Sequence, residues 1–338
     1  MSQLTNNTGI SLAMAVWLAH DDYDAGDQSF PDKEVLSATA LLKPTRQLVL
    51  SGRLTPEQRE VDVADLISSR FGHAIHDSIE HAWSKGYAHA MRKLGYPERV
   101  IEKVRINPDV VNDGDIPVYL EQRFFREIDS NVISGKFEVN DVVISGKFDQ
   151  IIDGQLCDTK TTSVYTYMNR TKEDDYRIQG SIYRWINPDK VTNDVMLIQH
   201  VFTDWQSSQA KTREDYPSSR IIEFPVELMS LKETENWILS KLREIQTNAQ
   251  LPEPEIVRCT DKELWKSDPV FKYYSNPETA QNGGRATKNF PNYPAAASYR
   301  NKMGKGVVVT VPGQVKACGY CPAFPICTQK DEYNHDRS

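Results

Sequence analysis

The dipeptide Asp153-Gly154 constrains the fold of this 338-residue chain more than any other feature. Both central positions of a type I′ turn need a positive φ, and Asp-Gly between two apolar runs is typical of a two-residue β-hairpin turn. In that hairpin Asp149 faces Asp158, and directly opposed residues of an antiparallel pair have Cβ atoms about 5 Å apart. The sequence therefore predicts a hairpin that brings two carboxylates together.

These two carboxylates suggest a site for a divalent metal ion. Ionised carboxylates at this distance repel one another unless a cation lies between them, and Mg²⁺ takes one or two carboxylates together with phosphate and water as ligands. Lys160 is two residues beyond Asp158 and points to the same face of the strand. An exposed hairpin with solvated carboxylates is the alternative interpretation. The same register places Lys147 opposite Lys160, which predicts a bend or bulge near Gly146.

The composition is that of a soluble globular protein. Hydrophobic residues make up 39% and charged residues 26% of the chain, which fits one large domain or two smaller ones. The chain has no apolar run of about 20 residues, the length that spans a bilayer, and the apolar stretch 10–19 lacks the preceding basic residue of a signal peptide. We therefore expect a cytoplasmic protein without a membrane partner. Its five cysteines are then metal ligands or core residues rather than disulfides.

The net charge of −7 hides an uneven distribution of basic residues. The segment 283–330 has seven basic residues and no acidic one, so the rest of the chain carries −14. The basic residues are Arg285, Lys288, Arg300, Lys302, Lys305, Lys316 and Lys330, with aromatic rings among them. Cations for the phosphate backbone and rings for base stacking are what single-stranded DNA binding uses. The segment is predicted to bind DNA through the first five of these residues, and a solvated basic face is the alternative.

The hydrophobic pattern predicts helices that alternate with strands. Helical spacing covers 62–94, 173–186 and 226–247, and strands are expected at 116–128, 131–139, 142–152, 155–161 and 195–203. Residues 132–138 nearly repeat 143–149, but Asp149 is preferred to Glu138 as an acidic ligand because its distance from Asp158 allows tight hairpin pairing. Prolines, glycines and aromatics dominate beyond residue 251, and no regular structure is assigned there.

Two further pairs of polar residues have a spacing of four. His76 and Glu80 lie on one face of the first long helix, and Gln179 and Tyr183 lie on one face of the helix after the hairpin. Each pair alone also fits a polar surface stripe.

Taken in order, these pieces resemble the PD-(D/E)XK nuclease superfamily, in its RecB-type exonuclease branch. The matching pattern, over 62–203, is Gly72-x-x-x-His76, Gly-x-x-Asp149, Asp158-x-Lys160-Thr161 and Gln179-x-x-x-Tyr183. Asp158 stands where many members have Glu. The resemblance implies an α/β (α+β) restriction-endonuclease-like core, with a central mixed β-sheet flanked by helices. This core would cover 61–250, with 1–60 packed on it and 251–338 forming an irregular cap that carries the cysteines.

The resemblance also implies roles in phosphodiester hydrolysis. Asp149, Asp158 and His76 would hold one or two Mg²⁺ or Mn²⁺ ions, and an imidazole among oxygen ligands suits Mn²⁺ somewhat better. Lys160 would orient or help to deprotonate the attacking water and favour the transition state.

Four other residues receive supporting roles. Gln179 and Tyr183 would contact the scissile strand or fix the lysine. Glu80 and Glu121 would support the metal ligands from behind, although Glu121 equally fits an exposed acid on a strand.

Three cysteines form a second cluster near the end of the chain. Cys318, Cys321 and Cys327 lie within ten residues of a Gly/Pro-rich loop and can converge on one metal centre, with free thiols as the alternative. A tetrahedral or cuboidal centre needs a fourth ligand. Cys157 alternates with Asp158, so it points to the other face of the strand and fits a small buried apolar residue. Cys259 is the favoured fourth ligand.

Spacing alone leaves zinc and iron–sulfur open. The stretch from Cys259 to Cys327 resembles phage-encoded relatives of the CRISPR-associated and AddB-type nucleases, which enclose a 4Fe–4S cluster with four cysteines. In many of them the first cysteine precedes the nuclease core, whereas this chain has no cysteine before Cys157. The resemblance implies a 4Fe–4S cluster, and Zn²⁺ is the alternative.

The function implied by these resemblances is a metal-dependent DNA exonuclease. It would act on single-stranded DNA or DNA ends in phage recombination, replication or repair, alongside recombination or replication proteins, in the host cytoplasm. One alternative is an endonuclease specific for flaps or branched DNA. Another is a non-catalytic DNA-end-binding accessory protein, and a third is a cysteine cluster that staples the fold without touching DNA.

Overall fold

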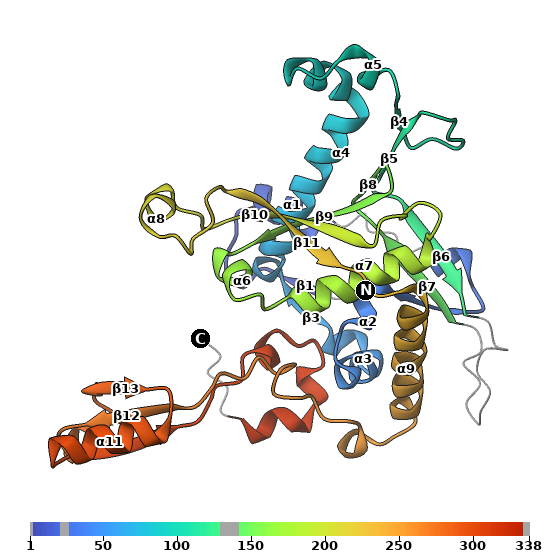
Figure 1. Ribbon diagram of the computed structural model, residues 1–338. Helices are drawn as coiled ribbons and strands as arrows, with labels where there is room; N and C mark the ends of the chain where they lie inside the picture. The colour runs from blue at the N-terminus through green and yellow to red at the C-terminus, as the bar shows by residue number, and fades with distance from the viewer. Residues whose placement is uncertain (1–2, 21–26, 129–141, 334–338) are drawn as a thin grey trace. The chain divides into compact units, whose positions relative to one another are not determined.

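The computed structural model describes residues 3–20, 27–128 and 142–333 (Figure 1). Contacts group the chain into two units, 1–43 with 60–246 and 44–59 with 247–338, here called the core unit and the C-terminal unit. The segment 44–59 thus belongs with the C-terminal unit, although the sequence suggested one N-terminal segment over 1–60. The predicted strand 131–139, which contains Glu138, lies outside the described residues.

A mixed six-stranded sheet forms the centre of the core unit. Its strand order is β11 (Ile221–Glu227), β10 (Val195–Phe202), β9 (Gln155–Thr162), β8 (Gln150–Ile152), β5 (Ile116–Leu120) and β4 (Val104–Ile106). The pairs β9–β10 and β4–β5 are parallel, and the other neighbours are antiparallel. A second sheet has the order β2 (Glu34–Ser37), β7 (Val142–Lys147), β6 (Arg123–Glu127), and β1 (Gln3–Thr5) pairs with β3 (Glu60–Asp62).

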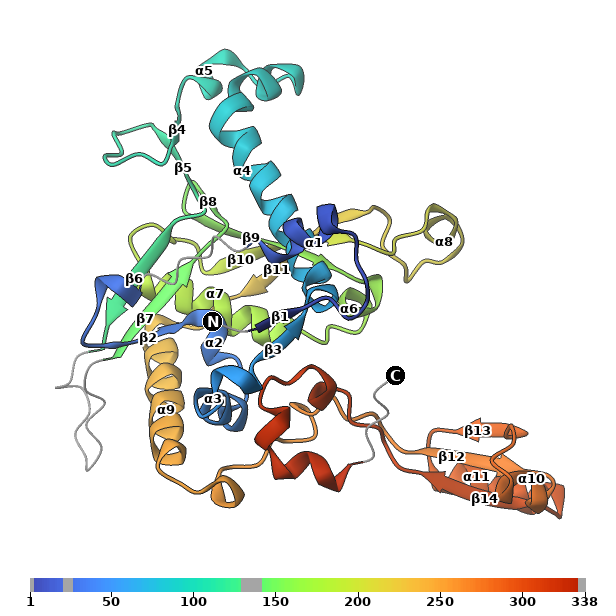
Figure 2. The ribbon, with the colours of Figure 1, turned by 180° about the vertical axis from the view of Figure 1, so that it is seen from behind.

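Helices flank these sheets. They are α1 (Leu12–Ala19), α2 (Ala38–Leu41), α4 (Ile67–Lys93), α5 (Glu98–Ile101), α6 (Val164–Met168), α7 (Glu173–Ile186), α8 (Ser207–Thr212) and α9 (Leu231–Ala249). The long helix α4 extends away from the sheets toward α5, as both views show (Figures 1 and 2). The predicted α/β fold, with mixed sheets flanked by helices, is confirmed. No helix of the described ranges is both long and apolar enough to cross a membrane.

Helix α7 packs tightly against strand β7. Three acidic residues in its first turn favour the positive end of the helix dipole, and its buried face includes Ile182, Tyr183 and Ile186. A Cβ added to Gly146 would lie 2.9 Å from side-chain atoms of both Tyr183 and Ile186. Glycine at this position therefore lets the helix approach the strand closely.

Two predicted strands are broken, and the breaks lie side by side. The expected strand 116–128 divides into β5 and β6 at Glu121, whose φ is +49°. The expected strand 142–152 divides into β7 and β8 at Phe148 and Asp149. The amide of Glu121 donates to the carbonyl of Asp149 at 2.9 Å, and the amide of Phe148 donates to the carbonyl of Gln122 at 3.2 Å. The prediction of two continuous strands was wrong, because each strand leaves one sheet and enters the other.

This break removes the conflict between Lys147 and Lys160. Lys147 pairs with Arg123 in the three-stranded sheet, so it does not lie opposite Lys160. The predicted bend near Gly146 is confirmed, and it falls at the two residues after Lys147.

The C-terminal unit contains regular structure that the sequence pattern did not reveal. Its antiparallel sheet has the order β13 (Lys288–Phe290), β12 (Val270–Tyr274), β14 (Val307–Val311), with helices α3 (Thr45–Gly52), α10 (Pro277–Gln281) and α11 (Tyr293–Met303). The side chain of Asn292 caps α11 at the amide of Ala295, and Gly304, with a φ of +66°, ends it. The prediction of an irregular segment beyond 251 was therefore wrong for residues 270–311.

Candidate metal centre and cysteine cluster

The predicted hairpin is present. Asp153 and Gly154 have φ values of +49° and +81°, as a type I′ turn requires, and Ile152 pairs with Gln155. The hairpin pairing runs as far as Gln150 with Cys157 and stops one pair short of Asp149 and Asp158. The carboxylate of Asp149 instead accepts a hydrogen bond from the amide of Thr159 at 2.7 Å. Asp149 is thereby fixed beside strand β9, which carries Asp158 and Lys160.

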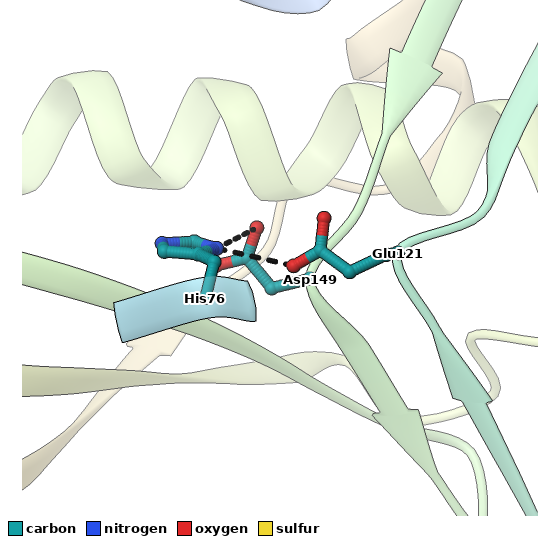
Figure 3. Close-up of side chains that lie close together, drawn as sticks. All are labelled: His76, Glu121 and Asp149. Atoms are coloured by element: carbon teal, nitrogen blue, oxygen red, sulfur yellow. Dashed lines mark hydrogen bonds and ion pairs between the residues drawn. The ribbon is translucent and has the colours of Figure 1, made fainter. Parts of the chain in front are cut away.

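Three side chains from separate elements meet at this point (Figure 3). Nδ1 of His76, on α4, lies 3.1 Å from Oε1 of Glu121 and 3.4 Å from Oδ1 of Asp149. One ligand atom from each residue lies within 4.8 Å of the others. Glu121, which the sequence placed behind the ligands, stands directly beside them because of the break after β5.

The imidazole of His76 is oriented from both sides. Its Nε2 lies 3.1 Å from the carbonyl oxygen of Thr159, so an Nε2–H would donate there and leave Nδ1 facing the carboxylates. Ligating histidines in proteins are commonly held by such a hydrogen bond from the second nitrogen. Burial alone would lower the pKa of His76, but the hydrogen bond with Glu121 and the charge of Asp149 raise it to about 9. In the absence of a metal, the imidazolium therefore balances these carboxylates.

Asp158 and Lys160 form a buried ion pair next to this group. Asp158 is 1% exposed, and Nζ of Lys160 lies 2.6 Å from its Oδ2. Apart from this ion pair, neither oxygen of Asp158 accepts a hydrogen bond of regular geometry from the described residues. A buried carboxylate with so few contacts is costly unless a cation compensates it. Its oxygens are therefore suited to a second positive charge.

The carboxylates influence each other's protonation. Burial, and then the charge of Asp158, raise the pKa of Asp149 to about 7. Burial alone would lower the pKa of Lys160. The negative charges of Asp158 and Asp149 have the larger combined effect, so the pKa of the lysine is raised. Lys160 consequently holds its proton in this arrangement, so it can position a water or phosphate oxygen and is a poor base.

A small pocket opens onto the group. His76, Glu80, Glu121 and Asp149 line it, together with Ile79, Leu120, Gln150 and Thr159. Nζ of Lys147 lies 2.8 Å from Oε2 of Glu121. The residue types fit a divalent metal ion, since oxygen ligands suit Mg²⁺ and Mn²⁺ and an imidazole suits Mn²⁺.

Gln179 and Tyr183 are brought to the same region by α7. Nε2 of Gln179 donates to the hydroxyl of Tyr183 at 2.8 Å, and both side chains are buried. Burial, followed by the charge of Asp158, raises the pKa of Tyr183. The pair lies within the electrostatic reach of Asp158 and Lys160.

The four predicted cluster cysteines gather in the C-terminal unit. Burial and then the charges of Glu263, Cys327 and Cys321 raise the pKa of Cys259 to about 12. Cys318 has the same two thiols as neighbours. Cys157 lies apart in the core unit, where it is 4% exposed, so its predicted place as a buried small residue is confirmed.

Three polar residues that sequence reasoning missed hold these cysteines. Nε of Arg46 donates to Sγ of Cys327 at 3.2 Å, and its guanidinium pairs with Glu253. The side chain of Gln329 accepts from the amide and donates to the carbonyl of Cys259, at 2.9 and 3.0 Å. Arg46 is 3% exposed, although it stands 281 residues from Cys327 in the chain. No local signal in the sequence distinguishes it from a surface arginine.

The predicted DNA-binding residues are all exposed in the C-terminal unit. They are Arg285, Lys288, Arg300, Lys302 and Lys305. Nζ of Lys288 lies 4.8 Å from the ring centre of Tyr299 and 5.2 Å from that of Phe290. Cations and rings are thus interleaved on this surface, as single-strand binding would require.

Comparison with known proteins gives few likenesses. No protein-family model matches the chain, and no curated protein matches it significantly. The crystal structure of SSO0001 is similar with a TM-score of 0.38 and 14% identity, over 71% of this chain and 86% of that chain. A phage-related exonuclease from Haemophilus somnus 129PT is similar with a TM-score of 0.22 and 17% identity, over 32% of this chain and 55% of that chain. Both TM-scores are low, and the interpretation of the site rests on its own geometry.

Proposed function

We propose that this chain is a metal-dependent DNA nuclease. The observation that carries the proposal is the convergence of His76, Glu121 and Asp149 beside the buried pair of Asp158 and Lys160. Such a set of ligands beside a fixed cation supports hydrolysis of a phosphodiester.

His76, Asp149 and Asp158 would hold Mg²⁺ or Mn²⁺, and the proximity of Glu121 supports adding it to the ligands. When bound, the ion would supply a polarised water and neutralise charge on the phosphate. Lys160 keeps a proton on Nζ and would orient the water or the phosphate oxygen through it.

The resemblance to the RecB-type branch favours an exonuclease on single-stranded DNA or DNA ends, and the pathway we propose is phage recombination, replication or repair. The exposed basic and aromatic residues of the C-terminal unit would hold the strand. An endonuclease for branched DNA uses the same chemistry and is distinguished by cleavage of circular substrates.

The cysteine cluster would hold a 4Fe–4S centre through Cys259, Cys318, Cys321 and Cys327. The resemblance of the stretch from Cys259 to Cys327 to nucleases with a 4Fe–4S cluster is what favours this centre over tetrahedral zinc. Brown protein that contains iron and sulfide would agree with it, and colourless protein with one zinc would refute it.

A cleavage assay tests the nuclease proposal directly. End-labelled single- and double-stranded DNA, linear and circular, is incubated with Mg²⁺, Mn²⁺ or EDTA. We expect cleavage with either metal, none with EDTA, and a loss of at least about a thousandfold in Asp158→Ala. Asp113→Ala, a change of an exposed acid in the same unit, is the matched control and should leave the rate unchanged. Undiminished activity in Asp158→Ala would sink the assignment, and binding without cleavage by the wild type would favour the accessory protein.

A further inference from the structure

Lys147 is a charged residue beside the candidate metal centre of the core unit, and the proposed chemistry gives it no role. Its Nζ lies 2.8 Å from Oε2 of Glu121, while Oε1 of the same carboxylate faces Nδ1 of His76 at 3.1 Å. The lysine side chain is 43% exposed and that of Glu121 only 14%. Lys147 therefore reaches this candidate ligand from the solvent side and holds one of its two oxygens.

The strand break at Phe148 and Asp149 keeps Lys147 at the centre. Lys147 is the last residue of β7 and stands two residues before Asp149, where the chain passes from the three-stranded to the six-stranded sheet. The amide of the intervening Phe148 donates to the carbonyl of Gln122 at 3.2 Å, which fixes the backbone at this point. The base of the lysine side chain is thus held near the metal ligands even when its ammonium group moves.

A second cation, Arg123, stands opposite Lys147 on the neighbouring strand β6. The two residues are register partners of an antiparallel pair, so their side chains leave the same face with Cβ atoms about 5 Å apart. Nη1 of Arg123 donates to Oγ of Ser145, two residues before Lys147 on β7, at 3.4 Å. Directly opposed like charges repel one another. An anion that contacts both side chains would relieve this repulsion.

A divalent ion bound at the candidate centre would compete with Lys147 for Glu121. The ion would neutralise the carboxylate that the lysine now pairs with, and its charge would repel the ammonium group. Ion pairs as exposed as this one are weak, so the contact is given up at little cost. Lys160 differs, because it is paired with the buried carboxylate of Asp158. Lys147 is therefore a cation that a bound metal ion can release.

We propose that Lys147 and Arg123 form a phosphate-binding pair for the DNA strand, and that binding of the metal ion moves Lys147 from Glu121 to this phosphate. Before the ion binds, the lysine neutralises Glu121. Afterwards Lys147 and Arg123 donate to the phosphate oxygens, for which both side chains are suited. The assignment rests on the proposed nuclease function, because that function brings a DNA phosphate to the centre. It makes tight strand binding depend on a bound ion.

Strand binding with and without metal tests the pair. A single-stranded oligonucleotide with phosphorothioate linkages, which resist hydrolysis, is titrated with protein in Mn²⁺ and in EDTA at equal ionic strength. Lys147→Met should weaken binding about tenfold in Mn²⁺, as expected for the loss of one contact with a charged group, and hardly at all in EDTA. Arg123→Gln should also weaken binding in Mn²⁺, whereas Lys211→Met, at an exposed lysine of the same unit, should leave it unchanged. A Lys147→Met variant that binds like the wild type in Mn²⁺, or is weakened equally in EDTA, would overturn the proposal.

Metal binding without DNA separates a switch from a merely structural ion pair. If Lys147 competes with the ion for Glu121, Lys147→Met should bind Mn²⁺ about tenfold more tightly than the wild type, although it binds the strand less well. Electron paramagnetic resonance of the free ion measures this affinity, and Lys147→Arg should keep both affinities near those of the wild type. Matching thermal melts show that each variant is folded. Mn²⁺ affinity that is unchanged or lower in Lys147→Met would contradict the competition.

The cleavage assay distinguishes failure of this pair from failure of the nuclease proposal. Both Lys147 effects in a protein whose wild type cuts no DNA would keep the pair and end the nuclease proposal. A wild type that cuts DNA, with a Lys147→Met variant that matches it in Mn²⁺ affinity and in strand binding, would end the pair alone.

Discussion

The two candidate metal sites of this molecule are assembled in opposite ways. The first site, formed by His76, Glu121 and Asp149 beside Asp158 and Lys160, takes its residues from a long helix, two strand breaks and a hairpin. It contains its own cations in His76 and Lys160. The cysteine cluster lies on short 3₁₀ turns and depends on the buried guanidinium of Arg46. The first site can stay ordered without a metal because protons and ammonium groups balance its carboxylates. The second site has few regular elements to hold it, and the charges of Arg46 and Lys330 act on its thiols.

The largest expected effect comes from removing the built-in cation of the first site. Lys160→Met leaves Asp158 buried without its partner, which should cost about 4 kcal/mol of unfolding free energy. Urea unfolding without metal measures the loss, and excess Mg²⁺ should restore part of it. Lys232→Met, which removes an exposed lysine, is the control. A Lys160→Met variant as stable as the control would show that the pair is not held as described.

Removing the buried cation of the second site, the cysteine cluster, should lower the free energy of unfolding by a somewhat smaller amount. Arg46→Met removes the partner of Glu253 and the donor to Cys327. We expect a loss of about 3 kcal/mol, because Glu253 is partly exposed and water can compensate it. Arg59→Met, at an exposed arginine of the same unit, should change little. Hydrogen exchange read unit by unit should place the loss in the C-terminal unit, and a loss spread equally over both units would contradict the comparison.

Protons and metal ions compete for His76 and Asp149, so the metal affinity of the first site should depend on pH. The raised pKa values of Asp149, about 7, and His76, about 9, mean that both groups hold protons at low pH. A metal must displace these protons, so binding is weak at pH 6 and strengthens as pH rises through these values. We expect Mn²⁺ affinity to rise about tenfold per pH unit for each proton displaced. Calorimetry in buffers of different ionisation enthalpy counts the protons, and affinity that is equal at pH 6 and pH 8 would rule out the mechanism.

The smallest effect should come from the basic surface, which lies outside both sites. Neutralising Arg300, Lys302 and Lys305 together should weaken single-strand binding and reduce the slope of log affinity against log salt by about 2. Manganese binding at the first site should not change. An unaltered salt slope would remove this surface from the DNA-binding account.

The hairpin and the helices could be predicted from the sequence because their signals are local. Asp153-Gly154 sets its own turn, and the spacing of apolar residues reveals the long helices. The break at Glu121 has no such signal, because the alternation of side chains continues while the strand changes sheets. The contact of Arg46 with Cys327 joins distant parts of the chain, and nothing near Arg46 announces it. Most candidate ligands could therefore be predicted from the sequence, whereas the position of Glu121 beside them and the contact of Arg46 with Cys327 could not.

The central claim is that a divalent ion binds at His76, Glu121 and Asp149, next to the carboxylate of Asp158. Titration of the protein with Mn²⁺, followed by electron paramagnetic resonance of the free ion, tests it without any DNA. The account predicts one bound Mn²⁺ that Mg²⁺ displaces, and affinity at least about a hundredfold weaker in Asp149→Asn and His76→Ala. Equal binding by wild type and both variants, or no binding by the wild type at pH 8, would contradict it.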